Sequence, residues 1–266
     1  MLRQEFRPGK AKFKPHPSGR KHMKEQYKFC VNGLTIRAEF APEDTQVIFI
    51  PLLERLTKLQ QEKNRRIIAF LAAPPAAGKS TLCCYLEHLS RTTPGLTHVQ
   101  VVGIDGFHYY QDYLDSHTID RNGETIPLAK IKGAPETYDV QKLRGLLDTL
   151  NEENQFWPVY DRRIHNPVEN AVEIREKIII LEGNWLLLDE APWNTLSCDY
   201  SVFLRAGDES QLERIVQRKM MGGFSEEHAR QIVRSNDWPN ILRCMNHSRR
   251  GGLTLAYNKN GILEEI

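Results

Sequence analysis

The sequence lacks several features that would place it in common classes of protein. Among its 266 residues only five are cysteines, and Cys30, Cys83, Cys84, Cys198 and Cys244 form no C-x-x-C pair. An odd number without paired spacing argues against a disulfide framework or a zinc site. No apolar run approaches the ~18 residues that cross a bilayer, and the N-terminus has no apolar core of a secretory signal. We therefore expect a soluble protein of the reducing cytoplasm.

The sequence also carries little net charge, only +2 at pH 7, which argues against nucleic-acid or membrane-surface binding by the whole chain. The N-terminus is an exception. Residues 1–25 mix Lys, Arg, Pro, Gly and His with few large aliphatic side chains, so they bury too little surface to offset the entropy of ordering. We expect a disordered basic tail there. The alternatives are an anchor for nucleic acid or anionic lipid, and a solvated extension before a second start at Met23.

What the sequence does contain is an alternation of apolar strand-like runs with helical segments. Continuous apolar runs of strand length are typical of strands buried on both faces of a parallel sheet. Their alternation with helices predicts a three-layer α/β/α sandwich around an open, mostly parallel sheet, of the P-loop NTPase type. The strands are expected within 65–73, 98–105, 176–183 and 199–206, and helices near 79–91, 139–151 and 208–221.

Small β-hairpins are predicted at both ends of this domain, which we place at residues 26–266. Asn32-Gly33 separates two strand-like runs and favours a two-residue hairpin turn. A second hairpin is expected around Asn260-Gly261. After the first hairpin, the apolar spacing across 43–63 predicts a helix, with Pro51 at a bend or at its start.

The stretch IIAFLAAPPAAGKSTLCCYL, residues 67–86, carries the strongest functional motif. It matches the phosphate-loop pattern G-x-x-x-x-G-K-[ST], except that alanine replaces the first glycine. A strand before the loop and a helix after it provide the N–H groups and the helix N-terminus that hold phosphates. The replacement costs little unless that position needs a positive φ, and the alternative is a helix start without a ligand. The predicted nucleotide site comprises Ala73, Pro74, Pro75, Ala76, Ala77, Gly78, Lys79, Ser80 and Thr81.

Two acids stand at the ends of predicted strands, where parallel α/β sheets present functional groups: Asp105 in VVGIDGFHYY and Glu182 in IIILEGNWLLLD. Lys79 can reach the β- and γ-phosphates, and Ser80 or Thr81 can offer a hydroxyl to Mg²⁺, which takes few protein carboxylates. We assign Asp105 to deprotonating an acceptor hydroxyl, and Glu182 with Ser80 to the metal. The alternatives for Asp105 are a magnesium-binding acid and a cap on the turn after its strand.

Two polar segments, IKGAPETYD and WPVYDRRIHNPV, are interpreted as loops that select the acceptor. The aromatics that follow Asp105 can wall a pocket or pack in the core. Tyr109, Tyr138 and Trp157 suit a nucleobase, whereas Asp161, Arg162, His165 and Asn166 suit a sugar or an acid, and the sequence does not choose. The candidates for acceptor binding are His108, Tyr109, Lys132, Glu136, Tyr138, Tyr160 and Arg162.

A predicted helix in the stretch 208–230 sets Arg214 and Arg218 four residues apart on one face, followed by Gly222-Gly223. Such arginines can move over a transferring phosphate and neutralise developing charge, with the glycines as a hinge. We predict a helical lid near 208–235 in which both arginines are catalytic. The alternative is a solvated basic helix face.

Taken together, AAPPAAGKST, DGFHYY, KGAPETYD, PVYDRRIHNPV, ILEGNWLLLD and the arginine-bearing helix resemble the family of phosphoribulokinase, uridine kinase and bacterial pantothenate kinase. The motifs follow the family's order over roughly residues 65–250. The resemblance is closest to a bacterial subgroup of the YggC type, whose members are described only as nucleoside or nucleotide kinases and also lack the first loop glycine. It implies Mg²⁺ and an ATP-dependent transfer of the γ-phosphate to a hydroxyl of a nucleoside, a pantothenate-like acid or a sugar.

The resemblance matches Asp105 to the family's base, Lys79 and Ser80 to its phosphate loop, Arg214 and Arg218 to lid arginines, and Glu182 to the acid after the later strand. The segment Thr118–Lys130 looks like an insertion, so it departs from the family on the acceptor side. The competing hypotheses are an ATPase or nucleotide switch acting on a protein partner, and a nucleic-acid-associated NTPase. We expect a small-molecule hydroxyl acceptor, no membrane and no nucleic acid, with a homodimer left open.

Overall fold

The computed structural model describes residues 24–31, 34–121, 123–151, 155–206, 209–257 and 263–266. The tail predicted for residues 1–25 lies outside this range except for its last two residues, and Glu25 already begins a strand. Within the described chain, Cys83, Cys84, Cys198 and Cys244 are free thiols. No helix in these ranges combines the length and the apolar character needed to cross a membrane.

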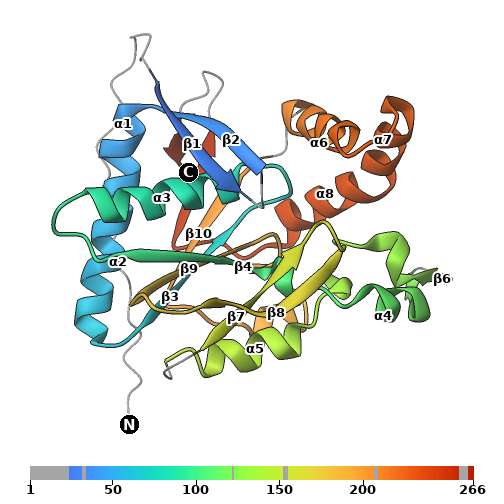
Figure 1. The fold of residues 1–266 in the computed structure, drawn as a ribbon, viewed down its shortest axis with the longest axis horizontal. Coiled ribbons are helices and arrows are strands. Elements are labelled where there is room, and N and C mark those ends of the chain that lie inside the picture. The colour runs from blue at the N-terminus through green and yellow to red at the C-terminus, as the bar shows by residue number, and fades with distance from the viewer. Residues whose placement is uncertain (1–23, 32–33, 122, 152–154, 207–208, 258–262) are drawn as a thin grey trace.

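A six-stranded sheet forms the centre of the molecule (Figure 1). Its neighbouring strands pair in parallel except at one edge, where β11 and β12 are antiparallel. The predicted α/β class with a mostly parallel sheet is therefore confirmed. In spatial order the strands are β12 (Leu263–Glu265), β11 (Leu253–Tyr257), β10 (Tyr200–Arg205), β3 (Ile67–Ala72), β9 (Ile178–Gly183) and β4 (Val99–Gly103).

Helices cover both faces of the sheet and give the predicted three layers. All residues of β3 are buried, and they alternate between two cores because successive side chains of a strand point to opposite faces. The odd-numbered residues face a core shared with α2 (Ile50–Lys63) and α3 (Lys79–Thr92). The even-numbered residues face a second core that includes α5 (Val140–Asp148).

The N-terminal elements form the predicted hairpin and a helix with an irregular start. β1 (Glu25–Val31) pairs antiparallel with β2 (Leu34–Phe40), although its turn at 32–33 lies outside the described residues. The helix expected across 43–63 consists of α1 (Pro42–Asp44), a π-helical turn (Thr45–Phe49) and α2. Because Pro51 at the start of α2 has no N–H to donate, it favours this change in hydrogen-bond register.

The C-terminal hairpin is present, but it is more than an appendage. β11 pairs in parallel with β10 and antiparallel with β12, so the hairpin extends the central sheet by two strands. Its connection at 258–262, which includes the predicted Asn-Gly turn, lies outside the described residues.

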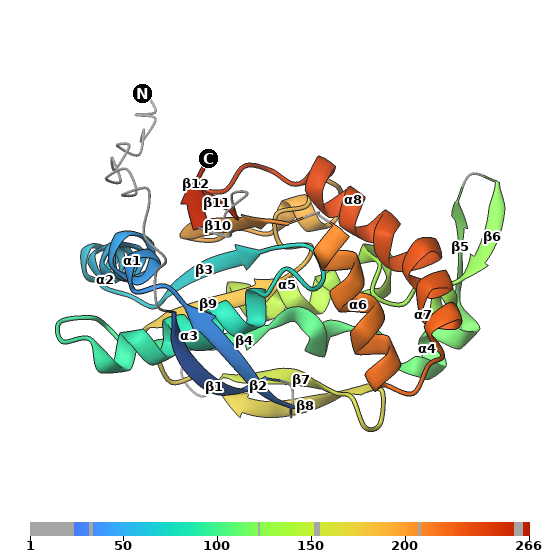
Figure 2. The same cartoon turned by 90° about the horizontal axis from the view of Figure 1, so that it is seen from above.

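The acceptor side differs from the sequence interpretation. The segment WPVYDRRIHNPV, which was interpreted as a polar loop, lies in an antiparallel hairpin of β7 (Phe156–Asp161) and β8 (Asn166–Glu173), so that interpretation was wrong. The register shifts around Pro158, which has no N–H for the ladder. The predicted insertion forms a second hairpin, β5 (Thr118–Arg121) and β6 (Glu124–Pro127), which projects beside α4 (Gln111–Ser116) (Figure 2).

Short 3₁₀ turns connect these acceptor-side elements. The turn that follows β4 carries Asp105. A second turn ends at the first residue of the segment 131–138, which we call the acceptor loop, and a third lies within that segment. A further turn precedes β10. They span Ile104–Phe107, Leu128–Ile131, Pro135–Thr137 and Trp193–Thr195.

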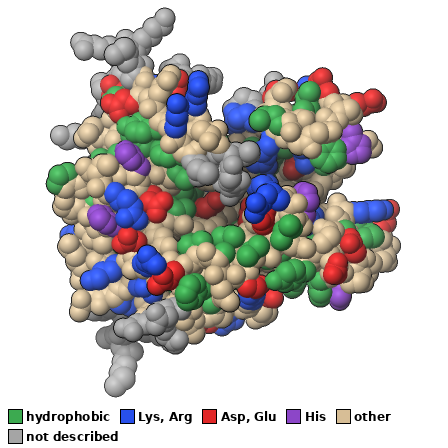
Figure 3. Space-filling view, viewed as in Figure 1, with side chains coloured by type: hydrophobic (Ala, Val, Ile, Leu, Met, Phe, Trp, Pro, Cys, Tyr) green, Lys and Arg blue, Asp and Glu red, His purple; other side chains and the backbone are tan. Residues whose placement is uncertain are grey.

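The helices at the end of the chain stand beside the sheet and form the region predicted as a lid. α6 (Glu209–Met221) and α7 (Glu226–Ile232) are followed by a π-helical turn (Val233–Asp237) and α8 (Trp238–His247). They pack around an apolar cluster of their own. Basic and acidic side chains gather between these helices and the body of the molecule (Figure 3).

Candidate active site

The phosphate loop connects β3 to α3 and has the backbone expected of an anion-binding loop. Ala76 and Gly78 have positive φ values of 57° and 88°, and α3 begins immediately afterwards at Lys79. Ala73 is fully buried and has no positive φ; its N–H donates to the carbonyl of Gly183 over 3.3 Å. Alanine at the position of the missing glycine therefore places no strain on the backbone.

Helix α6, in the region predicted as a lid, is docked on this loop. Arg214 Nε donates to the carbonyl of Ala76 over 3.3 Å, and the buried Gln211 Nε2 donates to the carbonyl of Pro75. These contacts place the start of α6 against the loop that would hold phosphate. Gln211 was missed by the sequence analysis, because a glutamine in an amphipathic helix carries no motif signal.

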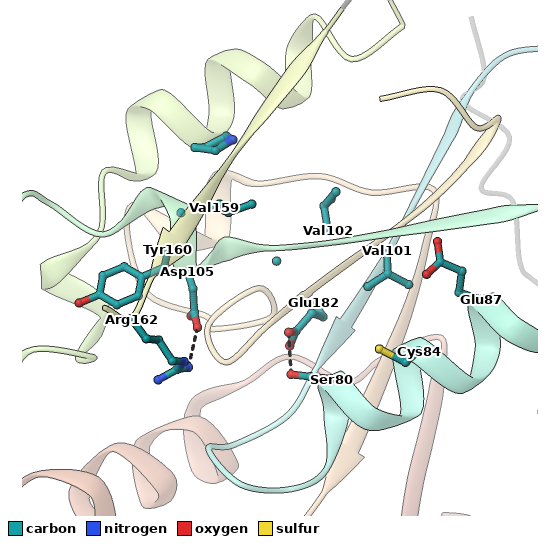
Figure 4. Close-up of a pocket in the computed structure, with 13 residues that line it drawn as sticks. Ser80, Cys84, Glu87, Val101, Val102, Asp105, Val159, Tyr160, Arg162 and Glu182 are labelled. Atoms are coloured by element: carbon teal, nitrogen blue, oxygen red, sulfur yellow. Dashed lines mark hydrogen bonds and ion pairs between the residues drawn. The ribbon is translucent and has the colours of Figure 1, made fainter. Parts of the chain in front are cut away.

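Glu182, at the end of β9, faces the start of α3. Ser80 Oγ donates to Glu182 Oε1 over 2.7 Å (Figure 4). Lys79 Nζ lies 3.8 Å from Glu182 Oε2. Burial raises the pKa of Glu182, with Lys79 and Ser80 opposing the rise and Asp105 adding to it. The ionised form of Glu182 is therefore less favoured at this buried position than it would be in water.

The donor set at this point fits a magnesium ion. Glu182 Oε2 is buried and accepts no hydrogen bond from the described residues, while the Ser80 hydroxyl lies beside the other oxygen. A hydroxyl and a single carboxylate are a typical protein contribution to Mg²⁺, which keeps several waters and takes its other oxygens from phosphates. A cation here would also offset the cost of the buried charge.

Asp105 lies at the carboxyl edge of the sheet, in the 3₁₀ turn that follows β4. Its carboxylate lies 3.6 Å from the guanidinium of Arg162, and both side chains are about half exposed, at 45% and 48%. Its backbone carbonyl is 2.9 Å from His108 Nδ1. The carboxylate is thus free to face a ligand, while the backbone of the turn is fixed.

Arg218 lies one helical turn beyond Arg214 on α6. Desolvation is the largest cause that lowers the pKa of Arg218, and the positive charge of Arg162 lowers it further. The negative charges of Asp237 and Asp105 act in the opposite direction. The two predicted lid arginines therefore differ in place: Arg214 contacts the phosphate loop, and Arg218 stands within electrostatic range of Asp105 and Arg162.

A pocket of about 280 Å³ connects Asp105 with Ser80 and Glu182. Five residues predicted for the site line it together: Ser80, Asp105, Tyr160, Arg162 and Glu182 (Figure 4). The pocket is also lined by Cys84, Glu87, Val101, Val102, Gly103, Gly106, Pro158 and Val159, which the sequence analysis did not single out.

Gly106 makes a close backbone contact in the wall of this pocket. A Cβ built on Gly106 would lie 2.2 Å from the carbonyl oxygen of Pro158 and 2.8 Å from the amide nitrogen of Val159. Only glycine allows β7 to approach the Asp105 turn so closely. The DG pair was visible in the sequence, but the strand that requires it was not.

His108, Tyr138 and Tyr160 form an aromatic group beside Asp105. The ring centroids of His108 and Tyr138 are 3.9 Å apart, and those of His108 and Tyr160 are 5.3 Å apart. Burial lowers the pKa of His108 and raises that of Tyr138, so both rings favour their neutral forms. Tyr160 alone of the three lines the pocket.

The aromatics suggested for a nucleobase are largely engaged elsewhere. Tyr138 and Trp157 are only 3% and 1% exposed, and Trp157 Nε1 donates to the carbonyl of Gly103 over 2.9 Å. Tyr109 stacks on Tyr113 with centroids 4.3 Å apart. None of these three side chains lines the pocket with Asp105.

The predicted residues of the acceptor loop make polar contacts of their own. Lys132 Nζ donates to Gln111 Oε1 over 2.7 Å and to the carbonyl of His165 over 3.0 Å, and burial lowers its pKa. Glu136 pairs with Arg121 and Arg243 through its two oxygens, at 2.7 Å each. Lys132 thus borders the hairpin that carries Tyr160, whereas Glu136 faces away toward α8.

The remaining polar candidates on the β7–β8 hairpin also have protein partners. The guanidinium of Arg163 pairs with Asp161, lowering the pKa of that carboxyl to about 2. Asn166 Oδ1 accepts the N–H of Gln111 over 2.8 Å. His165 has a positive φ of 53° in the connection between the two strands.

Comparison with known proteins gives a consistent class. No family model matches the chain. It is 39% identical over 234 residues to the "Uncharacterized protein YggC" of Escherichia coli K12, which covers 87% of this chain and 95% of that protein. It is 30% identical to the "Putative uridine kinase C227.14" of Schizosaccharomyces pombe over 71% of this chain and 82% of that protein. A pantothenate kinase from Halalkalibacterium halodurans is 29% identical over 64% and 60% of the two chains.

Solved structures agree with these relatives. A crystal structure titled "putative fructose transport system kinase", from Silicibacter sp. TM1040, superposes with a TM-score of 0.64 at 28% identity, covering 75% of this chain and 98% of that one. The YFH7 protein of Saccharomyces cerevisiae, at 17% identity and a TM-score of 0.62, shares the fold over 79% and 98% of the chains. The fold and phosphate loop define a P-loop kinase. The chain belongs to the family that includes YggC, uridine kinase and pantothenate kinase, as its motifs predicted.

Proposed function

We propose that this protein is an ATP-dependent kinase that transfers the γ-phosphate of ATP to a hydroxyl group of a small metabolite. The observation that carries the proposal is that Asp105, Ser80 and Glu182 line the same pocket. A base for the acceptor and a metal-binding pair beside a phosphate loop are the parts that phosphoryl transfer requires. The kinase names of the relatives support the same chemistry.

In the proposed reaction, Asp105 accepts the proton of the acceptor hydroxyl as its oxygen attacks the γ-phosphorus of ATP. The bond from that phosphorus to the bridging oxygen breaks, and ADP leaves with the electron pair. Asp105 suits this role because its carboxylate is half exposed and opens into the pocket. Arg162 orients the carboxylate from 3.6 Å.

The phosphate groups of ATP would be held by the N–H groups of residues 73–81 and by Lys79. Ser80 and Glu182 would hold Mg²⁺, which would neutralise part of the negative charge of the phosphates. Arg214 keeps α6 on the loop, and Arg218 would approach the transferring phosphate from the side of Asp105. Positive charge at that position stabilises the charge that develops on the phosphoryl oxygens.

For the acceptor, we favour a polyhydroxylated or acidic molecule over one held by base stacking. The pocket wall supplies carboxylates, one guanidinium and a single aromatic, Tyr160. Tyr138 and Trp157, the aromatics that would stack a nucleobase, are buried. Hydroxyl and carboxylate groups of an acceptor can pair with Asp105, Arg162 and Tyr160.

The deciding experiment measures ADP release by the purified protein with Mg²⁺ and ATP, across pools of sugars, sugar phosphates, pantothenate-like acids and nucleosides. We expect the rate to rise well above the baseline without acceptor in one of the sugar or acid pools. A rise with nucleosides alone would support the kinase and overturn the preference for sugars and acids. Replacing ATP with GTP in the productive pool tests the nucleotide preference.

Two outcomes would contradict the kinase. A high rate that ignores every acceptor would identify an ATPase, and tight ATP binding with a flat low rate would favour a nucleotide switch that acts on a protein partner. A nucleic-acid-associated NTPase predicts salt-dependent binding to DNA or RNA that disappears when residues 1–22 are removed.

A further inference from the structure

Four charged side chains from separate segments meet behind the acceptor loop. Glu136 Oε1 accepts from Arg243 Nη1 on α8, and Glu136 Oε2 accepts from Arg121 Nη2 on β5, at 2.7 Å each. Arg243 Nε also donates to both oxygens of Glu190, at 3.2 and 3.1 Å. One carboxylate therefore joins the loop, the inserted hairpin and the helix at the base of the lid.

This network is partly removed from solvent, which separates it from ordinary surface pairs. The side chains of Glu136 and Arg243 are 23% and 27% exposed. Burial raises the pKa of Glu136. The hydrogen bond from Arg243, the backbone N–H of Glu136 and the positive charges of Arg243 and Arg121 together more than offset that rise, so the net change in the pKa is downward. The carboxylate is accordingly charged at neutral pH, and its pairs weaken only as the pH falls through the lowered pKa.

Two buried tryptophans and one residue near the lid helices also donate hydrogen bonds to the acceptor loop. Trp185 Nε1 donates to the carbonyl of Gly133 over 3.1 Å, and Trp193 Nε1 donates to that of Pro135 over 3.2 Å. From the lid side, Asn236 Nδ2 donates to the carbonyl of Lys132 over 3.2 Å. The loop thus rests on buried indoles while Glu136 and Lys132 connect it to the lid.

The acceptor loop is also hydrogen-bonded to the turn that carries Asp105. The N–H of Tyr109 donates to the carbonyl of Thr137 over 3.0 Å, and the N–H of Asp139 donates to that of Phe107 over 2.7 Å. Between these two bonds, the ring of Tyr138 packs against that of His108 at an interplanar angle of 39°. A shift of Glu136 would therefore be transmitted within a few residues to the position of the proposed base.

We propose that Glu136 is a positioning residue that clamps the acceptor loop between α8 and the β5–β6 hairpin and so sets how the acceptor is presented to Asp105. The proposal rests on the proposed kinase function. It assigns Glu136 an indirect effect on the acceptor, through Arg243 and Arg121, in place of the direct contact considered from the sequence. It also gives the inserted hairpin a role in acceptor selection, because Arg121 holds that hairpin on the same carboxylate.

The first test compares steady-state kinetics of Glu136→Gln and Arg243→Met with the wild type. Loss of a charge-assisted pair at a partly buried site is expected to raise the acceptor KM by roughly tenfold or more, while the ATP Kd stays within about twofold. Both variants break the pair between Glu136 and Arg243, although Glu136→Gln also weakens the pair with Arg121 and Arg243→Met also removes the pair with Glu190. The double variant should therefore be less impaired than the sum of the two single effects predicts. Additive effects in the double variant would contradict a shared pair.

Arg230→Met is the matched control. Arg230 also bridges two carboxylates, but its partners Glu213 and Glu226 both belong to the lid helices, and all three side chains are well exposed. Exposed pairs contribute little, so this variant should leave the acceptor KM within about twofold of the wild type. An equal rise in KM for Arg230→Met would show a general sensitivity of the lid and would overturn the specific role of Glu136.

The second test needs no acceptor. Hydrogen exchange by mass spectrometry should show faster exchange across residues 131–139 in Glu136→Gln and Arg243→Met, and unchanged exchange across the phosphate loop. Unchanged exchange in 131–139 would overturn the clamp whatever the kinetics show. If the wild-type protein uses no acceptor, the kinase function is overturned, and the acceptor part of this proposal with it. Faster exchange in the variants would still establish the contact between Glu136 and Arg243.

Discussion

The two halves of the candidate site are built in different ways. The phosphate side uses nine consecutive residues, 73–81, and one acid from a neighbouring strand, and its principal ion pair is largely buried, with 15% exposure for both Lys79 and Glu182. The acceptor side draws on residues from 105 to 243, and its central pair, Asp105 and Arg162, is 45% and 48% exposed. A contiguous site can be shaped before any ligand arrives, whereas a site assembled from distant segments depends on the contacts between those segments.

This difference separates two kinds of mutational sensitivity. On the phosphate side, changes act on local backbone shape and on one buried charge. On the acceptor side, changes act on the approach of β7 to the Asp105 turn and on the ion pairs of the acceptor loop. Four substitutions test the comparison, and two further ones serve as their controls.

The largest effect is expected from Asp105→Asn. An amide cannot accept the proton of an acceptor hydroxyl, so kcat should fall by about 10²- to 10⁴-fold. The ATP Kd should stay within about twofold, because the change is on the acceptor side. Stability should change little, since an exposed pair with Arg162 contributes about 1 kcal/mol or less. Coupled ADP release and isothermal titration with ATP measure both quantities, and a variant with full turnover would remove Asp105 from the mechanism.

Gly106→Ala should have the next largest effect. The added Cβ meets backbone atoms of Pro158 and Val159 at 2.2 and 2.8 Å, so β7 must move away from the Asp105 turn. Overpacking against backbone costs about 3 kcal/mol. We expect a clear loss of stability on chemical unfolding, with the acceptor KM raised more than the ATP Kd.

Gly103→Ala provides the control for that variant. A Cβ on Gly103 would meet only the side chain of Glu182, at an ordinary 3.6 Å, and Gly103 has an extended backbone with φ of −114°. Its free energy of unfolding should change by about 1 kcal/mol or less. Equal destabilisation by the two variants would show that the approach of β7 does not distinguish Gly106.

The same contrast explains what the sequence could predict. Periodicity and motif order predicted the buried strands, the phosphate loop and the arginine helix, because each signal lies within about a dozen residues. The β7–β8 hairpin was interpreted as loop because Pro158 and the charged residues 161–163 interrupt the strand pattern, and because β8 is mostly polar and half exposed. The hairpin forms because β7 and β8 pair through their backbones, and a single sequence does not show which segments pair.

The acceptor residues show the same limit. Glu136 was visible as a polar residue in a loop, but its partners Arg121 and Arg243 lie 15 and 107 positions away. The burial of Tyr138 and Trp157 also depends on helices and strands from elsewhere in the chain. Residue type predicted which groups have chemistry, and long-range packing decides which of them face the pocket.

Glu182→Gln tests the buried charge of the phosphate side through stability. Burial raises the pKa of Glu182, so the folded state holds the proton more tightly than the unfolded chain does. The stability that this carboxyl contributes is present at pH values below its ordinary range and is lost as the pH rises through the raised pKa. Without nucleotide, the neutral variant should therefore gain on the order of 1 kcal/mol at pH 8, or roughly 2–4 °C in Tm.

Calorimetry at pH 5 and pH 8, without Mg²⁺ or ATP, measures this difference. The gap in Tm between variant and wild type should widen with rising pH, while Mg²⁺-dependent turnover is lost. A variant less stable than the wild type at pH 8 would show that the charge interaction with Lys79 outweighs the cost of burial.

The smallest effect is expected from Ala73→Gly, which restores the usual phosphate-loop pattern. Ala73 is fully buried and has no positive φ, so glycine relieves no strain, while the loss of a buried methyl group and the greater freedom of the unfolded chain cost about 1 kcal/mol. The ATP Kd should stay within about twofold. Gly78→Ala gives the contrast, because its φ of 88° penalises any Cβ and the change should weaken ATP binding. If Ala73→Gly instead tightened ATP binding about tenfold, alanine at 73 would be a defect of the loop, and the phosphate side would be less completely formed than its backbone indicates.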